Sequence, residues 1–303
     1  MAGSQLDPPS LSVVVASYNS RDTIVGCLES LRGQKTGHAY EILVVDSSTD
    51  GTGGLVADRF PDVVLLQSQH RLFAGGARNL GMAKARAPVI AFMDADCTVG
   101  DDWVDEVMAA QVCGHATVTG VIDNGSRASV IAWVYYFCEF NLWLPNRNAR
   151  QVSEAAGCCL SLSRSVFDRY GPFLEGTYCS DTAFHWKVRE DGQSTFFAPR
   201  IRVYHHVAGS LPSLLVHIFH HRRYYARVKC TVKGLTPGGR LLELLLLPAT
   251  PLLLMGAVLL RLRRCPSYLP IFLGLSPVVF LGFVARALGE AVGYLEPEPR
   301  NGR

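Results

Sequence analysis

Two aspartates one residue apart, Asp94 and Asp96, follow the apolar run Pro88–Met93. In an extended strand, side chains two positions apart project to the same side. This spacing therefore brings two carboxylates together where a buried strand reaches the surface of the protein. Carboxylate oxygens suit a hard divalent cation, and such a cation can hold a diphosphate. A solvated turn after a strand could contain the same two aspartates. The neighbouring segments of the sequence are therefore needed to decide between a metal site and such a turn.

The segments on either side of this pair alternate between strand and helix patterns. The patterns predict strands at residues 11–16, 41–45, 63–66, 88–93, 117–122 and 155–163, and helices at residues 24–31, 77–85, 103–113 and 180–190, with one more helix ending at residue 60. This alternation predicts an α/β fold, a mostly parallel sheet with helices on both faces. Ligands bind such sheets beyond the carboxyl ends of the strands. Tyr18, Asn19 and Asp46 stand at two of those ends, and we expect them to share one site with the aspartate pair.

Two other classes of α/β protein fit the sequence less well. A dinucleotide-binding oxidoreductase needs glycines in its first strand-to-helix turn, so that a pyrophosphate can approach the backbone. The turn Ala16–Ser20 contains none. A nucleotidyltransferase would have a Gly-rich, Lys-containing loop at the same place, and this loop is also absent. We therefore expect neither activity.

The composition limits the compartment and the partners. A net charge of +3 over 303 residues is too small to indicate a nucleic-acid partner. Nine scattered cysteines without a C-x-x-C pair argue against a disulfide framework and for a reducing compartment. The stretch Met1–Ser10 has no basic segment followed by an apolar one, so no signal peptide is expected. We therefore expect the catalytic part to face the cytoplasm.

The last third of the chain changes in character. Residues 211–240 are rich in basic side chains and are expected to form an amphipathic segment beside a membrane. Two apolar runs follow within residues 241–286, each about long enough to cross a hydrocarbon core of roughly 30 Å. Prolines interrupt both runs, so spanning helices and re-entrant or interfacial helices both remain open. We expect a tail at residues 1–10, a catalytic domain at 11–210, these membrane segments, and a second tail at 287–303, with the protein attached to the cell membrane.

Four ordered motifs resemble those of family 2 glycosyltransferases. They are Val13–Asn19, Val44–Thr52, Gly75–Gly81 and Met93–Asp96, and the match extends from about Leu11 to His206. The resemblance implies the GT-A fold, a nucleotide-sugar donor and inversion of the anomeric centre. It also implies that Asp46 binds the nucleobase, that Asp94 holds the ribose or sugar, and that Asp96 binds Mg²⁺ or Mn²⁺ on the diphosphate. Arg78, in the Ala-Arg-Asn segment, is implied to face the donor.

The resemblance places the remaining catalytic groups later in the chain. An inverting transfer needs one general base for the acceptor hydroxyl, and the family supplies an Asp at the start of a helix after the metal motif. Asp181 matches this place, with Ser180 where Glu is commonest, and a helix N-terminus stabilises its anion. His205 and His206 follow a late strand, where related GT-A enzymes often place a metal- or phosphate-binding histidine, and either could act so.

The expected function is metal-dependent transfer of one sugar from a UDP- or GDP-sugar to a hydroxyl of a lipid or glycan acceptor near the membrane. Polymerising family members carry a Gln-x-x-Arg-Trp motif, and its absence favours a single addition. Asp46 is followed by two serines in place of a second acidic residue or Asp-Asn-Gly, which leaves the choice of nucleobase open. The alternative is a catalytically silent, membrane-attached nucleotide-sugar-binding or scaffold protein. The aspartates at positions 94, 96 and 181 weigh against it.

Overall fold

The computed structural model describes residues 8–145 and 148–296, which form two compact units that interleave along the chain. The first unit comprises residues 8–122, 148–176 and 180–206, and the second comprises residues 123–145, 177–179 and 207–296. Most of the tail expected at residues 1–10 lies outside the described residues. The described part of the tail expected at residues 287–303 belongs almost entirely to a helix.

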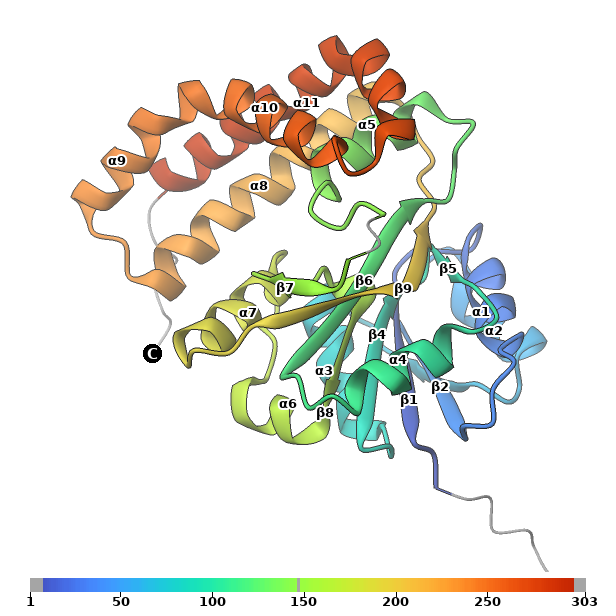
Figure 1. Ribbon diagram of the computed structural model, residues 1–303. Helices are drawn as coiled ribbons and strands as arrows, with labels where there is room; N and C mark the ends of the chain where they lie inside the picture. Colours follow the sequence, from blue (N-terminus) through green and yellow to red (C-terminus); the bar gives the residue numbers. More distant parts are fainter. Residues whose placement is uncertain (1–7, 146–147, 297–303) are drawn as a thin grey trace, which may run out of the picture. The chain divides into compact units, whose positions relative to one another are not determined.

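The first unit is built on a nine-stranded sheet in the order β3-β2-β1-β4-β8-β6-β9-β5, with β7 paired to β9 (Figure 1). The strands are β1 (Leu11–Ser17), β2 (Tyr40–Asp46), β3 (Val64–Gln67), β4 (Val89–Asp94), β5 (Cys97–Val99), β6 (Thr117–Asn124), β7 (Arg150–Val152), β8 (Leu160–Ser163) and β9 (Thr195–His205). Strands β1 to β4 pair in parallel, as the alternation of strands and helices predicts. Val13, Val14 and Val15 of β1 have no exposed surface, because β1 is covered on both faces.

The other half of the sheet is antiparallel. Strand β8 runs antiparallel to β4 and β6, and β9 runs antiparallel to β5 and β7. The short 3-10 turn η1 (Gly157–Cys159) leads directly into β8, whereas β7 earlier in the chain pairs with β9. The sheet is therefore mixed, with its parallel part where the sequence shows regular helices between strands.

Helices cover both faces of this sheet. They are α1 (Ile24–Arg32), α2 (Thr52–Arg59), α3 (Ala74–Lys84), α4 (Trp103–Gln111), α6 (Arg164–Tyr170) and α7 (Ser180–Glu190). Residues of α3, α6 and α7 form one core with Val14, Leu43 and Phe92 of the strands. Helix α1 packs on the opposite face, where Cys27 Sγ lies 4.0 Å from Met93 Sδ. Phe92 and Met93 are consecutive in β4 and so point to opposite faces.

The second unit consists of helices. They are α5 (Val130–Glu139), α8 (Leu211–Lys233), α9 (Pro237–Leu246), α10 (Thr250–Leu262) and α11 (Leu269–Leu295), with the 3-10 turns η2 (Leu247–Ala249) and η3 (Pro266–Tyr268). Helix α11 packs closely along α8. The approach is so close that a Cβ at Gly289 would overlap the carbonyl oxygen of Phe219, so only glycine fits there. A buried ion pair also joins the two helices, with Arg222 Nε donating to Glu290 Oε1 at 2.8 Å.

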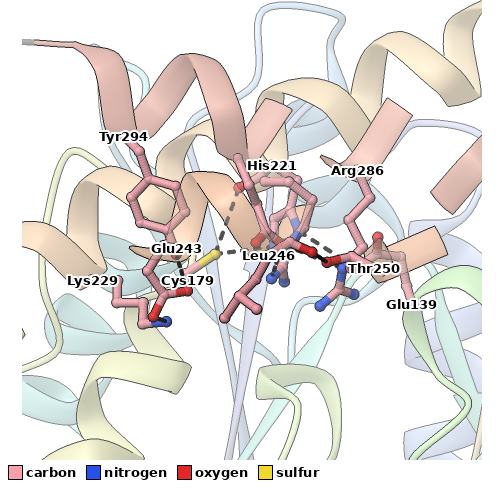
Figure 2. A network of polar contacts seen from close by, with 11 residues as sticks. Glu139, Cys179, His221, Lys229, Glu243, Leu246, Thr250, Arg286 and Tyr294 are labelled. Carbon is pink, nitrogen blue, oxygen red and sulfur yellow. Dashed lines mark hydrogen bonds and ion pairs between the residues drawn. The ribbon is translucent and has the colours of Figure 1, made fainter. Parts of the chain in front are cut away.

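A network of polar contacts ties distant segments into the second unit (Figure 2). Cys179 Sγ lies 3.4 Å from His221 Nε2, and His221 Nδ1 lies 3.5 Å from Glu139 Oε2. Lys229 Nζ donates to Glu243 Oε1 at 2.7 Å. These contacts connect α5 and the short segment 177–179 to α8, which is why both belong to this unit rather than to the sheet.

Two segments of the second unit are long and apolar enough to cross a membrane. They are Pro237–Leu262 and Pro266–Leu295, and only 17% and 22% of their most apolar windows are buried. Leu245 of α9 and Leu253 of α10 are each 69% exposed. The apolar side chains expected at residues 241–286 are thus largely displayed on the surface of this unit.

Candidate active site

The carboxyl ends of the parallel strands bring the expected residues to one edge of the sheet. In the strand register, Ser17 pairs with Asp46 and Ala16 pairs with Asp94. Asp46 and Asp94 therefore flank the end of β1 on its two sides. Asp96 follows two residues after Asp94, in the turn between β4 and β5.

Arg78 of α3 links this edge to the interior of the unit. Its side chain is 3% exposed, and Nη2 donates to Asp94 Oδ1 at 3.0 Å. The guanidinium lies against Gly157, where an added Cβ would overlap it. Burial alone would lower the pKa of Arg78, but the carboxylates of Asp94 and Asp181 raise it, so its positive charge is permanent. Burial and the Asp96 carboxylate raise the pKa of Asp94, against the opposing effect of Arg78.

Asp96 and His205 form a group able to bind a metal ion. Asp96 Oδ1 lies 3.5 Å from His205 Nε2, and with Cys97 Sγ these ligand atoms lie within 4.8 Å of one another. Burial raises the pKa of Cys97 well above its ordinary value, and a hard divalent ion prefers the carboxylate and the imidazole of this group to a sulfur ligand. The Asp96 side chain is 38% exposed, which leaves coordination positions for a substrate. The carboxylate, with open positions beside it, fits a hard divalent ion such as Mg²⁺ or Mn²⁺.

His206 lies next to this group, but its ring has a different partner. Nε2 of His206 lies 2.9 Å from Thr98 Oγ1, and its backbone N–H donates to the Asp96 carbonyl oxygen at 2.8 Å. Burial and the neighbouring His205 lower the pKa of His206. Of the two histidines that the sequence singles out, the geometry brings the ring of His205, not that of His206, to the Asp96 carboxylate.

Asp181 lies in the first turn of α7, which begins at Ser180, and backbone amides hold both of its carboxylate oxygens. Oδ2 accepts from the N–H of Gly157 at 2.8 Å, and Oδ1 accepts from the N–H of Thr182 at 2.9 Å. Gly157 also lies against Arg78. Asp181 and the Arg78–Asp94 pair therefore belong to one site.

His185 supports Asp181 from within the unit, and the sequence analysis does not single it out. It has no exposed surface; Nδ1 lies 2.7 Å from the Asp181 carbonyl oxygen, and Nε2 lies 3.3 Å from the backbone nitrogen of Ala155. A carbonyl can only accept and an N–H can only donate, so the neutral ring has its proton on Nδ1. Burial lowers the pKa of His185, against the opposing effect of Asp181. The four-residue spacing from Asp181, one helical turn, is the sequence signal that could have found it.

The other end of the site is arranged around Asp46, which is 2% exposed. Its Oδ1 accepts from Ser17 Oγ at 2.8 Å and from Ser48 Oγ at 2.5 Å. Asn19 has a left-handed backbone, with φ at 49°, and its Oδ1 accepts from the N–H of Thr49 at 2.9 Å. The Asn19 side chain therefore joins the loops that follow β1 and β2.

Tyr18 stands at the end of β1 with 38% of its surface exposed. The guanidinium carbon of Arg71 lies 4.5 Å from the Tyr18 ring centroid and 5.0 Å from that of Phe73. A cation at this distance from an aromatic face is held by the ring quadrupole. The partly exposed aromatic ring of Tyr18 therefore lies beside the loops that surround Asp46.

Residues 12–171, just over half of the chain, match the family described as Glycosyl transferase family 2. The matched range includes the parallel strands, Arg78 and the aspartates at positions 46, 94 and 96. The chain therefore belongs to glycosyl transferase family 2, with a GT-A-like fold, as the sequence motifs indicate.

Two curated relatives show how far the similarity extends. Glycosyltransferase AglE of Haloferax volcanii is 26% identical over 217 residues, which cover 68% of this chain and 67% of AglE. WfaP of Escherichia coli, a UDP-Glc:alpha-D-GlcNAc-diphosphoundecaprenol beta-1,3-glucosyltransferase, is 32% identical over 104 residues, which cover 34% of this chain and 39% of WfaP. Matches to the first curated relatives span between 27% and 67% of their length.

A solved structure shows the same fold. The mannosyltransferase PcManGT from Pyrobaculum calidifontis, in complex with GDP-Man and Mn²⁺, superposes with a TM-score of 0.59 at 17% sequence identity. The superposition covers 94% of this chain and 89% of PcManGT. At this low sequence identity, the comparison shows a shared backbone fold and no more.

Proposed function

We propose that this chain transfers a single sugar from a nucleotide-sugar donor to a hydroxyl of an acceptor, with inversion at the anomeric carbon. The observation that carries the proposal is the placement of Asp181. Gly157 donates to its carboxylate at 2.8 Å and also lies against Arg78, which is bonded to Asp94. A general base thus lies beside the carboxylates assigned to the donor, an arrangement that suits a single displacement.

In the proposed step, Asp181 takes the proton of the acceptor hydroxyl while the hydroxyl oxygen bonds to the anomeric carbon. The bond from that carbon to the donor's diphosphate oxygen breaks, and the diphosphate leaves with the electron pair. The two backbone N–H donors fix the orientation of Asp181 and leave lone pairs on both oxygens for the incoming proton.

Three further groups would hold the donor. Asp96 and His205 would bind Mg²⁺ or Mn²⁺, which stabilises the negative charge that develops on the leaving diphosphate. Asp94, oriented through one oxygen by Arg78, would hold the ribose or sugar with the other. Asp46 would bind the nucleobase, with the Tyr18 ring beside it and Asn19 ordering the loop.

The second unit would attach the enzyme to a membrane and so select a membrane-borne acceptor. Its two apolar segments are mostly unburied, as a hydrocarbon environment requires, and the free cysteines of the chain fit the reducing cytoplasmic side. One relative, WfaP, is by its name specific for a diphosphoundecaprenol-linked acceptor. We therefore propose a lipid or lipid-linked glycan as the acceptor and the cytoplasmic side as the place of the reaction.

The test of the proposed reaction is Asp181→Asn in membranes incubated with radiolabelled nucleotide sugars, with lipid and aqueous products separated. Donor binding should persist while transfer falls by roughly two to four orders of magnitude, because the base is lost and the fold is kept. Asp102→Asn, at an exposed position, should retain full transfer. Unchanged transfer in Asp181→Asn would show that the base lies elsewhere.

A further inference from the structure

The side chain of Asn79 in α3 holds the backbone of Phe173 with two hydrogen bonds. Oδ1 of Asn79 accepts from the N–H of Phe173 at 2.9 Å, and Nδ2 donates to the Phe173 carbonyl oxygen at 2.9 Å. The same Nδ2 donates to Glu175 Oε1 at 2.8 Å. An amide side chain offers an acceptor and a donor side by side, so it can pair with a backbone as a neighbouring strand does. Asn79 therefore fixes the loop that follows α6.

The ring of Phe173 lies between β4 and α7. Its centroid is 5.3 Å from that of Phe92 in β4 and 4.9 Å from that of Phe184 in α7. Phe92 stands two residues before Asp94, and Phe184 stands three residues after Asp181. Phe173 is 2% exposed, and a ring in a close-packed interior cannot shift without moving its neighbours. The place of Phe173 thus sets the distance between β4 and the first turns of α7.

A second contact brings α3 directly against α7. A Cβ at Gly75 would lie 2.0 Å from the Leu174 carbonyl oxygen and 2.9 Å from Ser180 Cβ. Leu174 follows Phe173, and Ser180 precedes Asp181. The absence of a side chain at Gly75 therefore lets the start of α3 touch both the loop held by Asn79 and the beginning of α7.

We propose that Asn79 is a positioning residue for sugar transfer: by holding Phe173, it sets the place of Asp181 relative to Asp94. This inference rests on the proposed function, in which Asp181 is the general base. Proton transfer depends steeply on geometry, so a small displacement of α7 slows the reaction. Nucleotide binding is assigned to the strand ends and does not depend on the position of α7.

The test compares transfer and nucleotide binding in Asn79→Asp, a nearly isosteric change. The new carboxylate still accepts from the Phe173 N–H, but it cannot donate and it repels the Phe173 carbonyl and Glu175. Transfer in membranes from a panel of radiolabelled UDP- and GDP-sugars, at saturating donor, should fall by about ten- to hundredfold. Calorimetric affinity of the full-length protein for UDP or GDP with Mn²⁺ should change by less than about twofold. Asn79→Ala, which removes the three hydrogen bonds without adding a charge, should act in the same direction.

Gln34→Glu is the matched control, because Gln34 makes the same kind of contact elsewhere in the catalytic unit. Its Oε1 accepts from the Val104 N–H at 2.9 Å, and its Nε2 donates to the Gly100 carbonyl oxygen at 2.6 Å. These bonds join the end of α1 to the segment that leads into α4, and neither carries a group assigned to the reaction. Gln34→Glu should therefore transfer sugar as wild type does.

The double variant with Asn79→Asp and Asp181→Asn separates positioning from a general loss of stability. Added to Asp181→Asn, the Asn79→Asp change should lower transfer by less than about a further twofold, because residues that act through one another have non-additive effects. Three results would each overturn the role of Asn79 while leaving the base assignment intact: wild-type transfer by Asn79→Asp, an equal loss in Gln34→Glu, or fully additive losses in the double variant. Unchanged transfer in Asp181→Asn would overturn the base assignment and this inference together.

Discussion

Arg78 joins the two halves of the candidate site through a short chain of contacts. It bonds to Asp94 at 3.0 Å and lies against Gly157, whose N–H holds Asp181 at 2.8 Å. A guanidinium that is 3% exposed and packed on a backbone has little freedom to move. The position of the candidate base relative to Asp94 and Asp96 thus depends on a residue that need not touch the acceptor.

The first prediction concerns Gly157→Ala. The added methyl would occupy the space of the Arg78 guanidinium, which would break the contact with Asp94 or displace the N–H bonded to Asp181. Transfer should fall by about two orders of magnitude or more, because small misplacements of catalytic groups are costly. Gly54→Ala is the control, since nothing lies within 4 Å of a Cβ there. Activity of Gly157→Ala close to that of the control would show that Arg78 does not organise the site.

Residue types and local spacing reveal part of this site. The Asp94 and Asp96 pair, Asp46 and Asp181 stand at strand ends or at a helix start, where short-range patterns can be read. The contribution of Gly157 arises from contacts with Arg78 and Asp181, which lie far from it in the chain, and a single glycine carries no local signal of them. The choice between His205 and His206 likewise needs the pairing of β5 with β9.

Helix α7 is the element that carries Asp181, the proposed base, and a buried histidine, His185, contacts its first turn. His185 bridges the Asp181 carbonyl and the Ala155 amide only in its neutral form. Burial lowers the pKa of His185 below its ordinary value of 6.5. Its contribution to stability is therefore complete above pH 6.5 and is lost as the pH falls through its lower value in the folded protein.

The second prediction follows from this pH dependence. The free energy of unfolding of wild type should decrease as the pH falls below about 6.5, and His185→Gln should show a shallower decrease because it cannot take up a proton there. Denaturant unfolding of both proteins across pH 5 to 7.5, compared as a difference, removes the contribution of groups that they share. Parallel curves for the two proteins would contradict the role assigned to His185.

At the level of elements, hydrophobic periodicity predicts the parallel strands and their helices well. Strand β1 and helix α1 follow the predicted segments closely, because their apolar residues recur at the periods of a strand and a helix. The antiparallel pairs formed by β8 and β9 are harder to predict from the sequence, because their partner strands lie far away in the chain. Helix α5, which is rich in aromatic residues, belongs to the helical unit because it packs against α8 and α11.

The whole molecule combines a sheet-based catalytic unit with a helical unit that displays leucines. Each buried leucine contributes about 1.5–3 kcal/mol to membrane partition if lipid covers it. The most exposed leucines of α9 and α10, each 57–69% exposed, are Leu241, Leu242, Leu245, Leu246, Leu252, Leu253 and Leu260. A concentration of exposed apolar side chains on two helices is typical of an interaction site with a membrane or another protein. A lipid surface is the partner that we propose for these helices.

The third prediction concerns these leucines. The double variant Leu245→Gln and Leu253→Gln should bind anionic vesicles at least about tenfold more weakly than wild type, as measured by co-sedimentation. Val112→Gln is the control, because Val112 is 85% exposed in the catalytic unit. Vesicle binding by the double variant equal to that of the control would show that α9 and α10 do not carry the membrane attachment.

The most direct test concerns Asp96, which we propose holds the donor through a divalent cation. Mn²⁺-dependent donor binding and sugar transfer should both be lost in Asp96→Asn and in wild type treated with EDTA, because the carboxylate beside His205 is the proposed metal ligand. Asp101→Asn, which changes an exposed aspartate paired with Lys35, should behave as wild type. Full transfer by Asp96→Asn, or by wild type in EDTA, would contradict the account.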